Sequence, residues 1–221
     1  MDSLIFRSLT ICASVASLTA PSLAHPHVLV ELQSRIVVNA QGLIEGVDVD
    51  WTFDDGYAQT AIEGLDLDGD GELSSAELQP LTDENIASLK ELGYFTFMRS
   101  KGVQLPISDV TQYAQDYTAG KLTLRFRVPL QTPLDPHSGE FALKVYDPEF
   151  FISFEYPADA QVAVQGALPS GCKSDLLPLK TDTEIEQTRE VLASKDKDWK
   201  PEADEDLGGM FARAAVVTCA S

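Results

Sequence analysis

The chain has 221 residues, with 35 acidic and 16 basic side chains, so its formal net charge at pH 7 is -19. That charge disfavours binding to nucleic acid or anionic lipid, both of which attract Lys and Arg, and it favours cations. Hydrophobic residues make up 44% of the chain, which is enough for one domain with a sizeable core or for two small ones.

The first segment, residues 1–24, is typical of a secretory signal peptide. Its stretch from Leu9 to Ala20 is mostly apolar or small and is too short to span a bilayer. Ser22 and Ala24 place small residues at the two positions that signal peptidase inspects. We therefore expect cleavage after Ala24 and a mature chain, 25–221, in the periplasm.

Strands dominate the rest of the chain. His27 to Val38 and Leu43 to Phe53 alternate apolar and polar residues on either side of an Asn-Ala-Gln-Gly turn, which predicts a β-hairpin. The other predicted strands are Tyr94–Arg99, Lys121–Val128, Phe141–Tyr146, Phe150–Tyr156 and Gln161–Val164. Several short strands separated by turns indicate an α+β fold, mainly an antiparallel β-sheet or sandwich.

A helical insertion interrupts the strands at about 54–93. Asp54 to Gly64 and the apolar stripe from Leu78 to Leu92 predict two helices joined by a loop. Pro80 lies within the second pattern, so we expect a kink there or a restart capped by Thr82.

The C-terminal tail, about 179–221, contains a third predicted helix at Thr183–Ala193. The mature chain keeps two cysteines, Cys172 and Cys219, and an even count in an oxidising compartment predicts a disulfide. The bridge would close a loop of nearly fifty residues, worth about 4 kcal/mol on the chain-entropy model. It would tie the tail back to a single β-rich domain, 25–221. A thiolate metal site is the alternative, disfavoured by the wide separation of the two cysteines.

The sequence DLDGDGELSSAE, from Asp66 to Glu77, fits the twelve-residue EF-hand calcium loop. Carboxylates stand at positions one, three, five and twelve, and a glycine stands at position six. The predicted ligands are Asp66, Asp68, Asp70, the backbone carbonyl of Glu72, and Glu77. Calcium is a hard cation that takes about six to eight oxygens, and crowded carboxylates repel one another without a cation. The alternative is a solvated acidic loop.

The sequence carries one such loop, whereas EF-hands usually occur in pairs. An extracytoplasmic compartment also lacks the calcium swings that a sensor needs. We therefore expect structural Ca²⁺ that fixes the helix–loop–helix against the sheet, with a regulatory role as the alternative.

Two of the three histidines, His25 and His27, stand at the expected mature N-terminus. Residues i and i+2 of a strand point to the same face, so both imidazoles can bind zinc, nickel or copper. Cleavage after Ala24 would add the α-amine of His25 as a third nitrogen, whereas cleavage elsewhere leaves two imidazoles. Pro26 has no N–H, which excludes the copper motif that needs deprotonated amides before a third-position histidine. The alternative is two exposed histidines on a frayed terminus, and His137, in a Pro/Gly turn, is interpreted as a surface residue.

Several segments form a set when taken in order. They are HPHV at 25–28, VDVDWTFDDGY at 47–57, the calcium-like loop, YFTF at 94–97, LKVYDPEFFISFE at 143–155, Cys172 and the terminal VVTC. Together they resemble a family of secreted bacterial proteins of unknown function, whose members are commonly labelled the periplasmic component of an ABC-type transport system. The resemblance implies an accessory or substrate-binding protein that works with a membrane transporter of the nickel/cobalt-efflux or ABC type.

The resemblance also makes His25 and His27 the leading ligands for Zn²⁺ or Ni²⁺, with Asp54 and Asp147 as further oxygen ligands. Asp54 can instead cap the first helix, and Asp147 can belong to a plain turn. The chain lacks the histidine-rich loop of some zinc-handling members, which argues against zinc storage. We expect a non-enzymatic periplasmic metal-binding protein with no nucleic-acid partner. The alternatives are a calcium-stabilised interaction module that binds no transition metal, and an enzyme with a copper brace.

Overall fold

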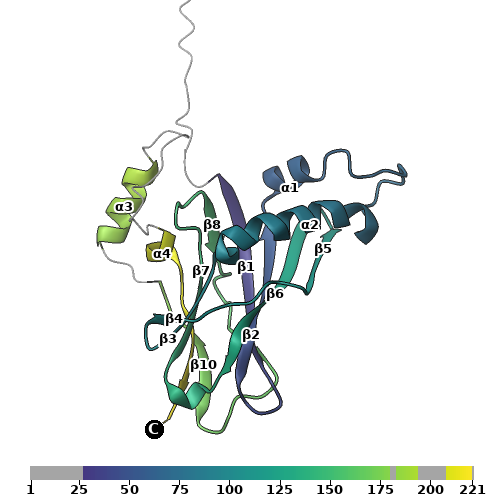
Figure 1. Ribbon diagram of the computed structural model, residues 1–221. Helices are drawn as coiled ribbons and strands as arrows, with labels where there is room; N and C mark the ends of the chain where they lie inside the picture. Colours follow the sequence, from purple (N-terminus) through teal and green to yellow (C-terminus); the bar gives the residue numbers. More distant parts are fainter. Residues whose placement is uncertain (1–26, 180–182, 194–207, 221) are drawn as a thin grey trace, which may run out of the picture.

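The computed structural model describes residues 27–179, 183–193 and 208–220 (Figure 1). The expected signal peptide, 1–24, and His25 lie outside the described residues. Within the described part of the chain, no helix is both long enough and apolar enough to cross a membrane.

The larger of two sheets has six strands in the order β5-β6-β2-β1-β8, with β9 also paired to β1. Their bounds are Val28–Val38 (β1), Ile44–Phe53 (β2), Tyr113–Thr118 (β5), Lys121–Leu134 (β6), Ile152–Glu155 (β8) and Ala163–Gln165 (β9). β1 and β2 form the predicted antiparallel hairpin, and the Asn39 side chain accepts the N–H groups of Gln41 and Leu43 in its turn. β8 and β9 pair with β1 in parallel, so this sheet is mixed.

The second sheet has five strands in the order β10-β11-β7-β3-β4, and all of its pairs are antiparallel. Their bounds are Thr96–Ser100 (β3), Val103–Gln104 (β4), Phe141–Val145 (β7), Cys172–Leu176 (β10) and Ala215–Cys219 (β11). β11 lies between β10 and β7, so the end of the tail is part of a sheet. The predicted disulfide is confirmed, and it joins Cys172 of β10 to Cys219 of β11.

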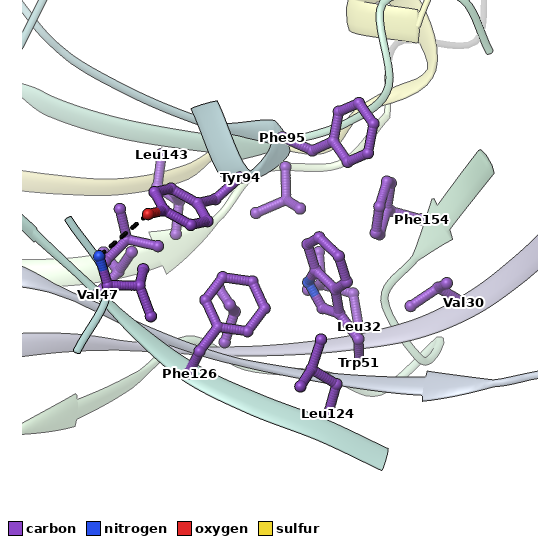
Figure 2. Packing of buried hydrophobic residues seen from close by; sticks show 14 of the residues in the cluster. Val30, Leu32, Val47, Trp51, Tyr94, Phe95, Leu124, Phe126, Leu143 and Phe154 are labelled. Atoms are coloured by element: carbon purple, nitrogen blue, oxygen red, sulfur yellow. Dashed lines mark hydrogen bonds between the residues drawn. The ribbon is translucent and has the colours of Figure 1, made fainter. Parts of the chain in front are cut away.

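The two sheets share one hydrophobic core, because alternating residues on the strands of both sheets point their side chains into the same cluster (Figure 2). Trp51 lies at its centre, with its ring 4.9 Å from that of Phe126 and 4.7 Å from that of Phe154. Such aromatic pairs are worth about 0.5–1.5 kcal/mol beyond the burial of their area. The buried hydroxyl of Tyr94 accepts the N–H of Val110 at 3.1 Å, so this polar group is satisfied inside the core.

The helices lie at the margins of the sheets (Figure 1). Their bounds are Asp55–Ala61 (α1), Ser75–Glu91 (α2), Thr183–Ala193 (α3) and Gly208–Phe211 (α4), with 3-10 turns at Gly93–Phe95 (η1) and Pro136–Ser138 (η2). α1 and α2 lie together at one end, where α2 packs against β5. The helix expected at Thr183–Ala193 is present as α3.

The structure corrects the expectation of a helix restart at Pro80. α2 continues through Pro80 as one helix, and Thr82 lies within it rather than capping it. The N-cap is Ser74, which forms a reciprocal capping box with Glu77, and the Thr82 hydroxyl donates to the Leu78 carbonyl. Pro80 removes one backbone hydrogen bond close to the start of the helix, where the capping box stabilises the backbone.

Candidate functional site

The loop between α1 and α2 projects from the body of the molecule and carries the predicted calcium ligands (Figure 1). Carboxylate oxygens of Asp66, Asp68 and Asp70 lie within 4.8 Å of one another. Asp66 accepts the N–H groups of Gly69 at 2.8 Å and Gly71 at 3.1 Å. The φ angles of these glycines, 75° and 83°, lie in the left-handed region, so a side chain at either position would strain the turn. The local backbone therefore gathers three carboxylates on one exposed loop.

Glu77, the fourth predicted carboxylate, reaches back to the start of the same loop. Its Oε1 accepts the N–H of Leu67 at 2.8 Å, and its Oε2 accepts the N–H of Ser74 at 2.9 Å and the Ser74 hydroxyl at 2.8 Å. Hydrogen bonds from the Ser74 backbone, the Ser74 hydroxyl and the Leu67 backbone lower the pKa of Glu77 to about 2. Glu77 lies outside the 4.8 Å group but is anionic across the neutral range.

The donor set of this loop fits a hard cation. Asp66, Asp68 and Asp70 are exposed and Glu77 is half-buried, and among the described residues no Lys or Arg forms an ion pair with any of these four carboxylates. Oxygen is the ligand that calcium takes, and a flexible loop can adjust to its large coordination shell. Glu72, the predicted backbone ligand, follows the three aspartates in the sequence. The backbone N–H of Glu72 donates to Oδ1 of Asp70 at 2.8 Å.

His27 lies at one end of the larger sheet, immediately before β1. Its backbone N–H donates to the Phe151 carbonyl at 2.8 Å, and its exposed ring lies 4.6 Å from the Phe151 ring. These contacts hold His27 next to the segment that leads into β8. The structure thus fixes one histidine of the predicted pair, while His25 precedes the described residues.

Asp54 caps α1, which was the alternative to a metal-ligand role. Its Oδ1 accepts the N–H groups of Gly56 and Tyr57, and its Oδ2 accepts the N–H of Leu29 at 2.9 Å. Burial raises the pKa of Asp54, but the donors of Leu29, Tyr57 and Gly56 together outweigh it, so the net pKa is lowered. Asp54 therefore joins the start of α1 to the start of β1.

Asp147 organises the turn between β7 and β8. Its Oδ1 accepts the N–H of Glu149, and its Oδ2 accepts those of Phe151 at 3.0 Å and Ile152 at 3.1 Å. The residue is buried, and that burial raises the pKa of its carboxyl despite the three donors. Asp147 thus fixes the segment that pairs with His27.

The structure brings His27, Asp54 and Asp147 to one end of the larger sheet without gathering their ligand atoms. Asp54 binds the backbone two residues after His27, and Asp147 binds the backbone of Phe151. Among the described residues, two groups of three potential ligands have atoms within 4.8 Å, and His27 belongs to neither.

One of those groups is the aspartate cluster, and the other is His137 with Cys172 and Cys219. Sequence reasoning interpreted His137 as a surface residue of a turn and did not place it near the cysteines. The residues are 35 positions apart along the chain, so no local spacing could indicate their proximity. The pairing of β10 with β11 determines it.

The fold and its sites define a mixed β-sandwich protein with an acidic helix–loop–helix insertion. The chain belongs to a family described as "Protein of unknown function (DUF1007)", whose model matches residues 10–219. It is also 30% identical over 100 residues to the "Uncharacterized 15.5 kDa protein in trpE 3'region" of Spirochaeta aurantia, covering 45% of this chain and 71% of that protein. Neither description states a ligand or an activity.

Proposed function

We propose that this protein is a periplasmic metal-binding accessory or substrate-binding protein of a zinc or nickel transport system, with a structural calcium site. The observation that carries the proposal is the acidic loop, where Asp66, Asp68 and Asp70 gather within 4.8 Å and Glu77 reaches back to the loop start. This arrangement supports an EF-hand-like site that Ca²⁺ occupies. The excess of acidic residues over the whole chain supports a role with cations.

Calcium in this loop would stabilise the insertion as a unit. α1 is tied to β1 through Asp54, and α2 packs against β5. The loop between them carries four carboxylates whose mutual repulsion opposes this arrangement. A bound divalent cation removes that repulsion and holds the two helices together, which favours a structural role.

The transported metal would bind at His25 and His27, with the α-amine of His25 added by cleavage after Ala24. Of the two predicted aspartates, Asp54 is the better fourth ligand. Its Oδ2 accepts one N–H and keeps a lone pair, whereas Oδ2 of the buried Asp147 accepts two. We infer that the metal passes between this end of the sheet and a membrane transporter of the nickel/cobalt-efflux or ABC type.

The calcium part is tested by titrating the mature, metal-free protein with Ca²⁺ and following heat release. Glu77→Gln removes the charge that the site needs, and we expect it to weaken calcium binding by about 100-fold, because the number of charged ligands tunes calcium affinity over several orders of magnitude. Glu72→Gln is the matched control, since Glu72 offers its backbone carbonyl and its side chain is exposed. Equal affinities for the wild type and Glu77→Gln would contradict the calcium site.

The transition-metal part is tested with Zn²⁺ and Ni²⁺ on the same protein and on a His25→Ala plus His27→Ala variant. We expect the double variant to lose the tight site while its calcium affinity stays unchanged. Unchanged zinc and nickel affinity would exclude this site. Calcium-dependent melting without any transition-metal binding would favour the calcium-stabilised interaction module.

A further inference from the structure

β10 and the C-terminal end of the chain lie at the opposite end of the molecule from the loop between α1 and α2 (Figure 1). His137 lies beside the disulfide that joins β10 to β11. Cys172 and Cys219 stand directly opposite each other on β10 and β11. The Nε2 atom of His137 lies 3.8 Å from Sγ of Cys172, and all three ligand atoms lie within 4.8 Å of one another. One imidazole and two sulfurs therefore meet at a single point.

The backbone around His137 holds the imidazole in this place. Asp135 caps the 3-10 turn η2 by accepting the N–H of His137 at 2.9 Å, and Pro136 is buried. η2 contacts β11, the strand that carries Cys219. His137 is itself exposed and both cysteines are half-buried, so the group is accessible from solvent. β10 is the edge strand of its sheet, which leaves one side of the disulfide uncovered by another strand.

The geometry matches a tetrahedral zinc site after the disulfide opens. Zinc binds thiolate sulfur at about 2.3 Å and imidazole nitrogen at about 2.0–2.1 Å, so tetrahedral angles place sulfur and nitrogen about 3.6 Å apart and two sulfurs about 3.8 Å apart. The distance between His137 and Cys172 already has the required size. After reduction, the two sulfur atoms need only move apart from bonding distance to about 3.8 Å.

We propose that His137, Cys172 and Cys219 form a redox-gated zinc site, closed while the disulfide is present and opened by a dithiol reductant. Two thiolates and one imidazole are an established zinc donor set, with water in the fourth position. Zinc would then take over from the disulfide as the link between β10 and β11. Exchange with a disulfide oxidant reverses this opening: the two thiolates re-form their disulfide, the oxidant is reduced to its dithiol, and the metal is released.

The opening is a two-electron thiol–disulfide exchange. One thiolate of the reductant attacks Sγ of Cys219, forms a mixed disulfide and releases Cys172 as a thiolate beside His137. The second thiol of the reductant then attacks its own sulfur in the mixed disulfide, closes an intramolecular disulfide and frees Cys219. Zn²⁺ binds both sulfurs as thiolates and Nε2 of the neutral imidazole, displacing any thiol protons to solvent.

The test uses the mature protein, reduced with a phosphine that is then removed under inert gas, and Co²⁺ as the probe. We expect one equivalent of Co²⁺ to produce thiolate-to-cobalt charge-transfer absorption in the reduced protein, and Zn²⁺ to abolish it. The oxidised protein should show no such band. His137→Ala should weaken cobalt and zinc binding at least about tenfold. Zinc should also slow alkylation of both cysteines.

Control variants separate this site from the others. The His25→Ala plus His27→Ala variant should keep the cobalt band, so failure of the N-terminal site leaves this result intact. The Cys172→Ser plus Cys219→Ser variant should lose the band while Trp51 fluorescence still reports a folded core. Unfolding of the reduced protein, a band that His137→Ala leaves unchanged, or alkylation that zinc does not slow would each overturn the proposal.

Discussion

The carboxylates of the acidic loop and those of the turns at Asp54 and Asp147 differ in what surrounds them. Both kinds accept backbone N–H groups. In the loop, three exposed aspartates gather within 4.8 Å. At Asp54 and Asp147, one carboxylate stands alone and joins separate elements through three N–H donors. Gathered carboxylates favour a cation, whereas a single satisfied carboxylate stabilises the chain itself.

Removal of the Asp147 carboxylate should have the largest effect on stability and tests whether a single satisfied carboxylate stabilises the chain. Asp147→Ala leaves the N–H groups of Glu149, Phe151 and Ile152 without their acceptor in a part-buried turn, and each such loss costs about 1 kcal/mol. We expect the free energy of unfolding in urea to fall by about 3 kcal/mol, with calcium affinity unchanged. Asp159→Ala, at an exposed position, is the control and should change stability by at most about 0.5 kcal/mol. Equal effects of the two changes would show that the Asp147 carboxylate is not structural.

Calcium should stabilise the protein through the acidic loop, independently of the turn at Asp147. At 100 times its dissociation constant, a ligand that binds only the folded state adds about 2.7 kcal/mol to the free energy of unfolding. We expect this gain in the wild type and also in Asp147→Ala, because the Asp147 carboxylate accepts from Glu149, Phe151 and Ile152, whereas the carboxylates of the acidic loop accept from the loop itself. Urea unfolding with calcium and with a chelator measures both gains. A smaller gain in Asp147→Ala would mean that the two regions are coupled.

Asp54 is a candidate for both roles, because it caps α1 and is also a predicted metal ligand. Asp54→Ala removes the N-cap of α1 and the acceptor for Leu29, and we expect a loss of about 1–2 kcal/mol in urea unfolding. Asp55→Ala is the control, since its ion pair with Lys121 is exposed and its loss should change stability little. Zinc affinity of the folded Asp54→Asn variant reports the ligand role separately. Unchanged zinc affinity would restrict Asp54 to capping.

Local features of the molecule could be predicted from the sequence, and long-range ones could not. The acidic loop is encoded within twelve consecutive residues, and the first hairpin by alternation around one turn. β11 was missed because a short apolar segment becomes a strand only when β7 and β10 flank it. The position of His137 likewise depends on the pairing of β10 with β11. Pro80 misled the prediction because the capping box at Ser74 stabilises the start of α2 around it.

The smallest predicted effect is the response to acid, in which the two regions should differ in sign. The folded pKa of Glu77, about 2, lies below its ordinary 4.5, so its contribution is present above pH 4.5 and is lost as pH falls towards 2. The folded pKa of Asp147 is raised above 3.8, so its contribution is present at low pH and is lost as pH rises through that folded pKa. Thermal melts across this range, with a chelator present, should show the wild type and Glu77→Gln converging towards pH 2. Asp147→Asn should instead improve relative to the wild type as pH rises. Parallel behaviour of the two variants would contradict the lowered pKa of Glu77 and the raised pKa of Asp147.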